Sequence, residues 1–333
     1  MTNREILRAG VVGVGSMGSH HARVYNELPN VELVGVADAD ASRAESTANT
    51  YGTEAVPTED LLDAVDVTSI SVPTGYHHDV ATSAMERDVS VLVEKPFVTD
   101  AEKGRDLIRM ARDRGLTLQV GHIERFNPVV DVLADLLPDL DVIAVAARRL
   151  GPPVDRDGND DIVMDLMIHD IDLVLSLVER DLEAVAAMSA RGKDHVAAQL
   201  QFSGDVVGSL TASRVTQEKI RDLSITARDC LVHVDYMDQS VEIHRHSSPE
   251  YETEDGDVRF RHESVVERPS VDSGEPLKRE LRSFVDAVRE GEEPKVTGAD
   301  GLRALSVAGQ ISDIATSRVH GEAEVNPSEV TTV

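Results

Sequence analysis

The amino-acid sequence predicts an α/β protein with two domains. Short apolar runs alternate with helical patterns over the first third of the chain, which is typical of parallel strands joined by crossover helices. Closely spaced strands follow and predict a second, α+β domain with an open, mostly antiparallel sheet. The length of 333 residues agrees with this division, because single hydrophobic cores rarely grow beyond about 250–300 residues. We expect the domains to span residues 1–122 and 123–333.

The first strand–helix unit contains a glycine-rich turn. Apolar residues 9–14 predict a strand that runs into a GxGxxG pattern ending at Gly18, and a helix is expected from residue 19 to about 28. A second apolar strand, residues 31–37, ends at Asp38, twenty residues after Gly18. The pattern alone is weak evidence. With a strand before it, a helix after it and an acid at this distance, it predicts a dinucleotide-binding Rossmann domain.

This turn also predicts where the cofactor lies. Glycines permit a tight turn and the close approach of a pyrophosphate to a helix N-terminus. Asp38 would accept hydrogen bonds from the adenosine ribose and repel a 2′-phosphate, so NAD is favoured over NADP. Arg43 is near enough in sequence to compete as a phosphate ligand. The residues of the turn that we expect to contact the cofactor are Gly13, Gly15, Ser16, Met17 and Gly18.

A strand over residues 89–93 stops abruptly at Glu94-Lys95-Pro96. Pro96 cannot continue the ladder and pushes Lys95 into an extended conformation. Open α/β sheets bind ligands at the carboxyl ends of their strands, and Lys95 is one of only six lysines. Lys95 is therefore a candidate functional residue, although a solvated lysine at a strand end is the simpler interpretation. The other elements expected in this domain are helices 59–65, 79–87 and 101–114, the last capped by Thr99, and strands 67–72 and 116–120.

The second domain is expected to begin with the strand 142–149 and the helix 165–177. Polar segments 151–161 and 247–274 are interpreted as loops, and apolar stripes predict two late helices, around Leu277–Val288 and Leu302–Ile311. The remaining expected strands are 185–190, 195–202, 206–214, 223–227, 230–235 and 241–244.

Asp165 and His169 lie four residues apart, so on a helix they would share one face. That face is otherwise apolar, so a buried histidine satisfied by a local carboxylate is one interpretation. Beside a dinucleotide fold and a strand-end lysine, the pair also suits catalysis. Oxidation of an alcohol needs a group that takes the hydroxyl proton, and a histidine oriented by an anion can do so.

Composition excludes several classes of protein. The chain has 61 acidic and 33 basic residues, a formal net charge of −28, and the acids are dispersed along the chain. With few lysines, many Asp, Ala and Val residues and no Trp, the composition resembles that of cytoplasmic proteins of salt-accumulating halophiles. The negative charge of the protein repels the phosphate backbone of nucleic acids, so no nucleic-acid partner is expected. No apolar run approaches the roughly 18 residues of a membrane helix, so no membrane partner is expected either. The N-terminus lacks a signal-peptide core and Cys230 is the single cysteine, which favours the cytoplasm.

A metal enzyme built from the histidines is a third alternative. His77, His78, His122 and His169 have no spacing typical of a metal site, so we expect no bound metal.

Four segments together resemble the glucose–fructose oxidoreductase/inositol dehydrogenase (Gfo/Idh/MocA) family: GVGSMGSHHARVY, VEKPF, the D-x-x-x-H of Asp165 and His169, and PLKRELRSFVDAVREG. The resemblance covers nearly the whole chain. It implies NAD(P)-dependent oxidation of sugars or polyols and an open-sheet domain that forms a homodimer or homotetramer. It also implies that Lys95 lies beside the reacting hydroxyl, that His169 is the acid/base with Asp165 as its partner, and that Pro73, His77 and Glu94 flank the cofactor.

The segments GHIERFNP, VPTGYHH and LMIHDIDL look most like the branch that contains UDP-N-acetylglucosamine 3-dehydrogenases. This resemblance implies oxidation of the 3-hydroxyl of a nucleotide sugar, whose diphosphate needs cations. Candidate substrate ligands are Arg125, Asn127, Arg148 and Arg149, although the last two could be strand-end residues paired with nearby acids. A free-sugar or inositol dehydrogenase would need no arginine cluster. A redox-inactive NAD-binding regulator, or a reductase on another small substrate, is a further alternative.

Overall fold

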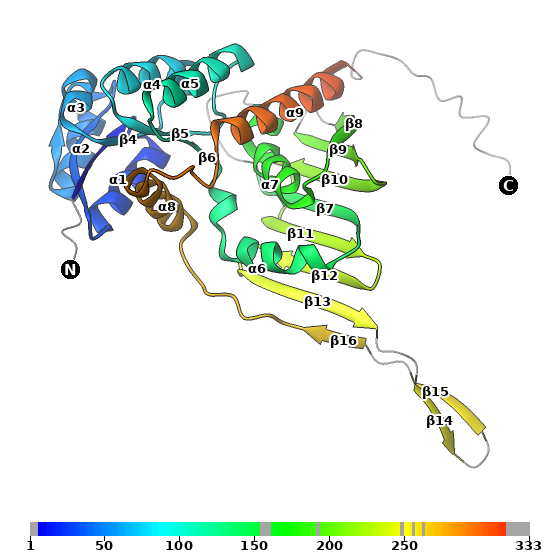
Figure 1. Cartoon of the computed structure of the whole chain (residues 1–333). Coiled ribbons are helices and arrows are strands. Elements are labelled where there is room, and N and C mark those ends of the chain that lie inside the picture. The colour runs from blue at the N-terminus through cyan, green and yellow to red at the C-terminus, as the bar shows by residue number, and fades with distance from the viewer. Residues whose placement is uncertain are drawn as a thin grey trace.

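The computed structural model describes residues 6–153, 161–190, 194–246, 250–254, 257–261 and 264–317. Each domain contains one large sheet, with the amino-terminal domain on the left of Figure 1 and the second large sheet on the right. The predicted fold class is confirmed: a parallel Rossmann sheet is followed by a mixed, mostly antiparallel sheet.

The first sheet has six parallel strands in the order β3-β2-β1-β4-β5-β6. The chain reverses its direction of progress between β1 and β4, and this switch point opens a crevice at the carboxyl ends of the strands. Every residue of β4, β5 and β6 is buried, which explains their continuous apolar sequences. The strands are β1 (Leu7–Val12), β2 (Val31–Ala37), β3 (Glu54–Ala55), β4 (Val67–Ile70), β5 (Ser90–Glu94) and β6 (Leu118–Gly121).

Five helices accompany this sheet: α1 (Ser16–Glu27), α2 (Ala41–Tyr51), α3 (Thr58–Ala64), α4 (His77–Glu86) and α5 (Ala101–Arg114). Helix α2 is additional to those predicted, and its caps are Asp40, which accepts from two backbone N–H groups, and Gly52 in the left-handed region. The predicted cap of α5 is wrong by one residue. The side chain of Asp100, not Thr99, accepts from the backbone N–H groups of Glu102 and Lys103.

The second sheet has eight strands in the order β16-β13-β12-β11-β7-β10-β9-β8. Only the pairing of β10 with β7 is parallel within it. Helices α6 (Pro128–Leu136) and α7 (Ile168–Val178) pack on one face of this sheet, and α6 is additional to those predicted. The strands are β7 (Val142–Leu150), β8 (Leu182–Ala190), β9 (His195–Phe202), β10 (Val206–Ser213), β11 (Ile220–Ala227), β12 (Cys230–Asp235), β13 (Ser240–His246) and β16 (Ser264–Glu267).

The predicted loop 247–274 is partly strand. It contains β16, which pairs with β13, and a two-stranded sheet of β14 (Glu250–Glu254) and β15 (Asp257–Arg261). All four residues of β16 are exposed, so the segment lacks the apolar alternation that would have revealed it. Most of the predicted loop 151–161 lies outside the described residues.

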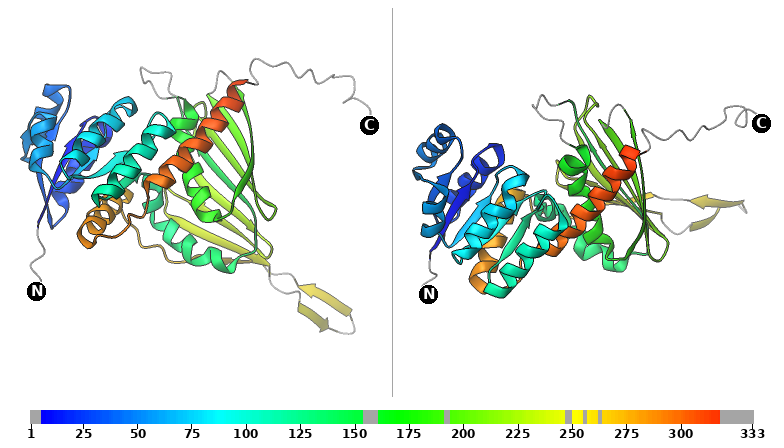
Figure 2. Two further views of the ribbon diagram at one scale, coloured as in Figure 1. Left: turned by 45° about the horizontal axis from the view of Figure 1, so that its top comes forward. Right: turned by 90° about the horizontal axis from the view of Figure 1, so that it is seen from above.

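The two C-terminal helices return to the first domain. Helix α8 (Pro276–Glu290) packs against α1, and its predicted apolar stripe, including Leu281 and Phe284, joins a core cluster of the Rossmann domain. Helix α9 (Gly298–Ser317) contacts α5 on one side and α7 and β8 on the other, as Figure 2 shows. The predicted domain boundary between residues 122 and 123 stays a prediction. Helix α8 belongs by sequence to the predicted second domain, but it packs against the first.

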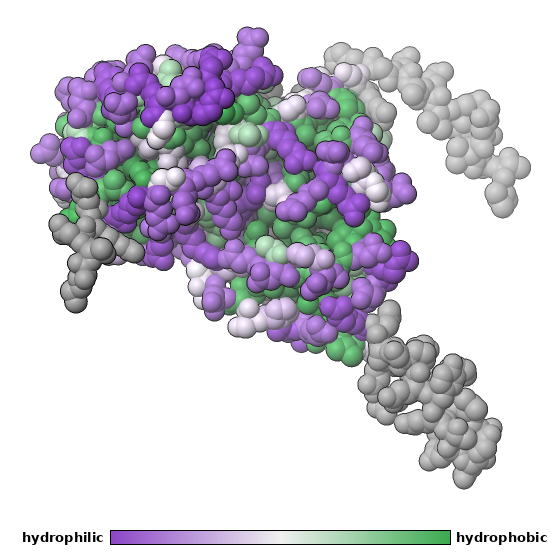
Figure 3. All heavy atoms as spheres, viewed as in Figure 1, coloured by the Kyte–Doolittle hydropathy of each residue, from purple (hydrophilic) through white to green (hydrophobic). Residues whose placement is uncertain are grey.

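The surface that α4 and α5 form is polar on the side of the molecule that Figure 3 shows. Hydrophilic residues predominate over α4 and α5 in Figure 3. Within the described ranges, no helix combines the length and the apolar character needed to cross a membrane.

Candidate active site

A cleft of about 790 Å³ opens where the carboxyl edge of the first sheet faces the second domain. Residues after β1, β4 and β5 form one wall, and residues from β7, α7, β10 and β11 form the other. The lining side chains most relevant to chemistry are Ser16, Glu94, Lys95, Arg149, Asp165, His169, Arg214, Lys219 and Arg221.

The glycine-rich turn has the geometry of a pyrophosphate site. Gly13 has φ +86°, and a Cβ on it would lie 2.7 Å from the backbone of Ser71. A Cβ on Gly18 would lie 1.8 Å from the Gly13 carbonyl oxygen, so neither position accepts a side chain. Gly15 is the N-cap of α1, where no side chain makes a capping hydrogen bond and the first turn contains no acid. The N–H groups of the first turn can therefore bind an anion beside Ser16 and Met17, which line the cleft.

Asp38 follows β2 directly and lies beside this turn. Its Oδ2 accepts a 2.8 Å hydrogen bond from the Val14 N–H, and its Oδ1 accepts one from the Asp40 N–H. Arg43 lies 3.7 Å from the Asp38 carboxylate. The N–H groups of α1, the side-chain-free turn and this carboxylate together fit NAD, which supplies a hydride acceptor when bound.

His77 connects the loops that follow β4 and β5. Its Nε2 lies 2.8 Å from the Val72 carbonyl oxygen, and its Nδ1 lies 3.0 Å from that of Pro96. The ring is buried, and neither His77 nor Pro73 lines the cleft. Their predicted contact with the cofactor stays a prediction, whereas Glu94 does line the cleft.

Lys95 extends from the end of β5 into the cleft, where it meets Asp165 of the second domain. Lys95 Nζ donates to the Asp165 carbonyl oxygen at 2.7 Å and to Asp165 Oδ1 at 3.0 Å. Arg214 Nη2 donates to Asp165 Oδ2 at 2.6 Å. Burial alone would raise the pKa of Asp165, but Lys95 and Arg214 lower it below its ordinary value. The carboxylate is therefore an anion between two cations.

The predicted orientation of His169 by Asp165 needs correction. The segment Val163–Met167 is a π-helical turn, and α7 begins only at Ile168. Because a π turn is wider than an α turn, side chains four apart no longer follow the spacing of a regular helix. The carboxylate of Asp165 contacts Lys95 and Arg214, while His169 Nδ1 is buried without a hydrogen-bond partner among the described residues.

His169 lines the cleft near Lys95. Burial lowers the pKa of His169 well below its ordinary value, and the charges of Lys95 and Arg149 lower it further. The imidazole is therefore neutral at neutral pH and can accept a proton.

Four cations other than Lys95 line the cleft: Arg149, Arg214, Lys219 and Arg221. Arg149 is buried and bonded to Asp170 and Glu124, at 2.8 and 2.6 Å from its Nη2. Arg221 is half-buried, and burial together with Arg149 lowers its pKa. Its guanidinium has no hydrogen-bond or ion-pair partner among the residues that the structure describes.

Sequence reasoning missed Arg214, Lys219 and Arg221. The sequence pattern does contain a signal for Lys219 and Arg221. Lys219 and Arg221 are spaced by two residues just before the predicted strand 223–227, so they continue the face of that strand that Leu223 buries.

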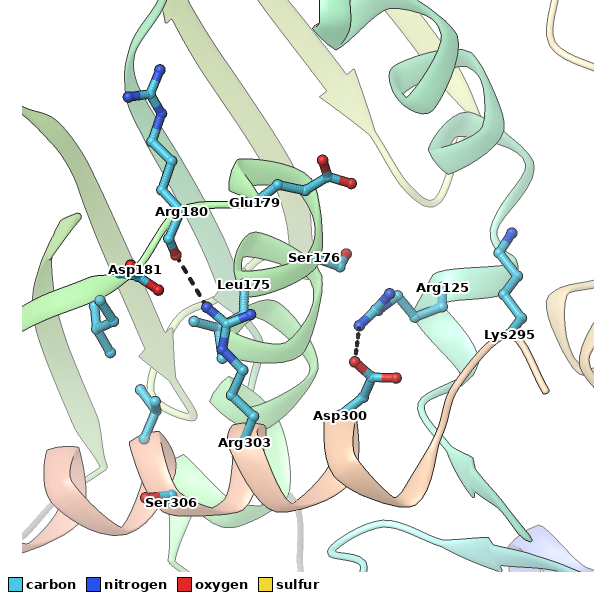
Figure 4. Close-up of a pocket in the computed structure, with 12 residues that line it drawn as sticks. Arg125, Leu175, Ser176, Glu179, Arg180, Asp181, Lys295, Asp300, Arg303 and Ser306 are labelled. Atoms are coloured by element: carbon cyan, nitrogen blue, oxygen red, sulfur yellow. Dashed lines mark hydrogen bonds and ion pairs between the residues drawn. The ribbon is translucent and has the colours of Figure 1, made fainter. Parts of the chain in front are cut away.

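Three predicted substrate ligands lie outside the cleft. Arg125 lines a separate pocket, where it bonds to Asp172 at 2.7 Å and faces Asp300 (Figure 4). Asn127 caps α6 and donates to the Tyr236 carbonyl oxygen. Arg148 is exposed and paired with Asp222. Adjacent residues of a strand point to opposite faces, so Arg149 reaches the cleft and Arg148 does not.

Comparison with protein families agrees with this geometry. Residues 7–122 match the model of an oxidoreductase family with an NAD-binding Rossmann fold. Residues 147–244 match the Gfo/Idh/MocA C-terminal domain.

Individual relatives cover nearly the whole chain. A UDP-N-acetylglucosamine 3-dehydrogenase of Acidithiobacillus ferrooxidans is 34% identical over 313 residues, which are 92% of this chain and 96% of the relative. The solved structure of that enzyme superposes with a TM-score of 0.82 at 32% identity, covering 93% of this chain and 98% of that one. An inositol 2-dehydrogenase of Rhizobium meliloti is 29% identical over 328 residues, 91% of this chain and 94% of the relative. The chain therefore belongs to the Gfo/Idh/MocA family, as an NAD-binding oxidoreductase that acts on CH–OH groups of sugars or related polyols.

Proposed function

We propose that the protein oxidises a secondary hydroxyl of a nucleotide sugar, and that the substrate is UDP-N-acetylglucosamine, oxidised at C3. The observation that carries the proposal is Arg221, a half-buried cation that faces the cleft. The charges of Glu124, Asp170 and Asp165 act on it, but its guanidinium has no hydrogen-bond or ion-pair partner among the described residues. Burying an unpaired charge is unfavourable, so such a cation suits an anionic ligand. A sugar diphosphate provides that charge, and the relative from Acidithiobacillus ferrooxidans is named for this substrate.

The residues of the cleft have distinct roles in this reaction. An ammonium group has three hydrogens, and two of those of Lys95 are directed at Asp165, so one remains for the oxygen of the reacting hydroxyl. The neutral imidazole of His169 accepts the hydroxyl proton. Lys219 and Arg221 bind the diphosphate at the other wall of the cleft.

A substrate panel tests the proposal. UDP-N-acetylglucosamine, free N-acetylglucosamine, glucose and myo-inositol are each supplied with NAD in molar KCl, and NADH formation is followed by absorbance. We expect the nucleotide sugar to have the highest kcat/KM. A much higher kcat/KM with a free polyol would favour the inositol dehydrogenase alternative, which the Rhizobium meliloti relative supports. NAD binding with no turnover of any of the four compounds would favour a regulator.

A matched pair of variants tests the cation. Arg221→Met should raise KM for the nucleotide sugar about 10- to 100-fold, because a hydrogen bond to a charged group contributes about 1.5–3 kcal/mol. KM for a free sugar should change little. Arg148→Met is the control, because Arg148 is exposed and outside the cleft. Equal effects of the two variants would contradict the placement of the diphosphate.

We also propose that the protein forms a homodimer or homotetramer through the outer face of the second sheet. Helices α7 and α9 lie on the opposite face, as Figure 2 shows. Paired residues on the outer face are small, such as Ala146 beside Ser209 and Ser224, while Met188 is 65% exposed and Val207 36%. Such a face can pack against a second sheet. Analytical ultracentrifugation in KCl tests this, and a monomer at micromolar concentration would contradict it.

The cytoplasm is the proposed location, on the basis of the single cysteine, Cys230, which excludes an internal disulfide. Fractionation of cells that express the tagged native protein would test this proposal.

A further inference from the structure

A buried polar cluster in the first domain includes Glu94, the residue next to Lys95 in the sequence. It consists of His21 from α1, Glu94 from β5 and Glu280 from α8, with ligand-type atoms all within 4.8 Å of one another. His21 Nε2 lies 2.9 Å from Glu94 Oε1, and His21 Nδ1 lies 2.9 Å from Ser69 Oγ. His21 and Glu280 are fully buried, and Glu94 is 7% exposed.

Glu280 is the unexplained member of this cluster. Both of its carboxyl oxygens are buried, and neither has a hydrogen-bond partner among the described residues. A buried polar group without a partner is unfavourable, so the site requires something that satisfies it. The roles assigned above to Lys95, Asp165 and His169 do not use this side chain.

The surroundings indicate which carboxyl group carries the charge. Glu94 contacts His21 and also accepts a 3.1 Å hydrogen bond from the Lys95 backbone N–H. Burial would raise the pKa of Glu94, but His21 and Lys95 lower it. Burial and the charges of Glu94 and Asp172 raise the pKa of Glu280 well above the ordinary range. Two buried carboxyl groups this close do not both ionise, so Glu94 is the anion and Glu280 is the neutral acid.

We propose that Glu280 is a positioning residue for Lys95. Glu280 donates its carboxyl hydrogen to the Glu94 carboxylate and so holds the end of β5. Glu94 has one oxygen on His21 and the other on the backbone N–H of Lys95. A hydrogen bond from Glu280 restrains this carboxylate from a third element, α8, and fixes where the Lys95 side chain enters the cleft. This gives α8, which is distant in sequence, a function at the site. The proposal rests on the role of Lys95 in the proposed function.

A divalent cation is the other way to satisfy these side chains, because imidazole nitrogen and carboxylate oxygens are common metal ligands. Unlike a cation, the carboxyl hydrogen of Glu280 requires no further ligands, and it leaves the hydrogen bond between His21 and Glu94 unchanged. Metal content is therefore one outcome of the test.

Three variants separate positioning from mere burial. Glu280→Gln keeps the size and a hydrogen-bond donor, and should retain kcat within about threefold. Glu280→Met keeps the volume but has no donor, and should lower kcat about 10- to 100-fold with the Kd for NAD unchanged, because small misplacement of a reacting group has effects of this size. Glu290→Gln, at the exposed end of the same helix, is the control and should match the native enzyme. Kinetics use whichever substrate of the panel the native enzyme turns over.

Native kcat in Glu280→Met, or an equal loss in Glu280→Gln, would overturn the proposal. So would one equivalent of divalent cation in the native protein, removed by a chelator with loss of activity. If Glu280→Met does not fold, infrared spectroscopy of the native protein and Glu280→Gln decides. The band of a neutral buried carboxylic acid at pH 7 should be present only in the native protein, and its absence there would overturn the proposal. If no panel substrate reacts, the proposed function fails while the infrared comparison still tests Glu280.

Discussion

Lys95 and Asp165 come from different domains and meet in the cleft, with Lys95 Nζ 3.0 Å from Asp165 Oδ1 and 2.7 Å from the Asp165 carbonyl oxygen. Lys95 follows the last strand residue of β5, and Asp165 lies in the π-helical turn before α7. Because Arg214 bonds to the second carboxylate oxygen, Asp165 also connects this contact to the end of β10. The pair therefore fixes the lysine of one domain against the other.

This contact predicts the effect of substitutions at both residues. Lys95→Ala should lower kcat by about 10²–10⁴-fold, the usual contribution of a group that acts on the reacting hydroxyl, with NAD binding largely intact. Asp165→Asn should have a smaller effect, because the amide oxygen can still accept from Lys95 although the charge is lost. Steady-state kinetics and NAD titration measure both. Asp222→Asn, in an ion pair with Arg148 outside the cleft, should leave kcat unchanged. Full activity of Lys95→Ala would remove Lys95 from the reaction.

His169 predicts a specific pH dependence. Its pKa is lowered well below about 6.5, so the folded protein keeps the imidazole neutral as pH falls through 6.5. The unfolded chain takes up the proton first, so this group destabilises the fold progressively below about pH 6.5 and has no such effect above it.

Protonation of His169 should also lower kcat/KM at acidic pH, because a protonated imidazole cannot accept the hydroxyl proton. This fall should lie below pH 6.5, because kcat/KM reports the pKa of the free enzyme. His169→Ala should lower kcat about 10²–10⁴-fold and remove this fall. A fall at or above pH 6.5, or an active His169→Ala protein, would show that another group is the base.

The position of Asp38 predicts cofactor choice. NAD should be preferred over NADP, and Asp38→Ser should narrow the difference in kcat/KM, because a carboxylate repels a 2′-phosphate. The same change removes an acceptor from the Val14 N–H, so thermal stability should be followed in parallel. Arg43→Met, which leaves Asp38 intact, should further weaken NADP use. A preference of the native enzyme for NADP would contradict the assignment.

The net charge of −28 predicts a salt-dependent fold. Diluting KCl from molar to millimolar levels should lower the melting temperature, because screening of repulsion between surface charges is lost. The ion pairs among exposed residues oppose this trend only weakly, since each contributes about 0–1 kcal/mol. A melting temperature that does not change with KCl would contradict the halophilic interpretation.

Local sequence was sufficient for the elements that depend on neighbouring residues. Apolar runs between breakers located the buried strands, and the observed helix Ala101–Arg114 has the predicted bounds. The glycine turn, Asp38 and Lys95 were recognisable because their roles require a particular residue at a particular place in one strand–turn unit. The exposed strand β16 was not predicted because its two valines, Val265 and Val266, are adjacent and do not alternate with polar residues.

Only the tertiary structure decided which side chains meet. Asp165 faces Lys95 and Arg214 rather than His169 because a π turn changes the helical spacing, and Arg125 and Arg148 point away from the cleft while Arg221 faces it. Glu280 reaches Glu94 because α8 returns to the first domain, across nearly 190 residues of sequence. The positions of helices and strands follow from the preferences of neighbouring residues, which can be read from the sequence. Pairing of charges follows from how the elements pack, because Coulomb energy depends on distance and burial rather than on separation along the chain.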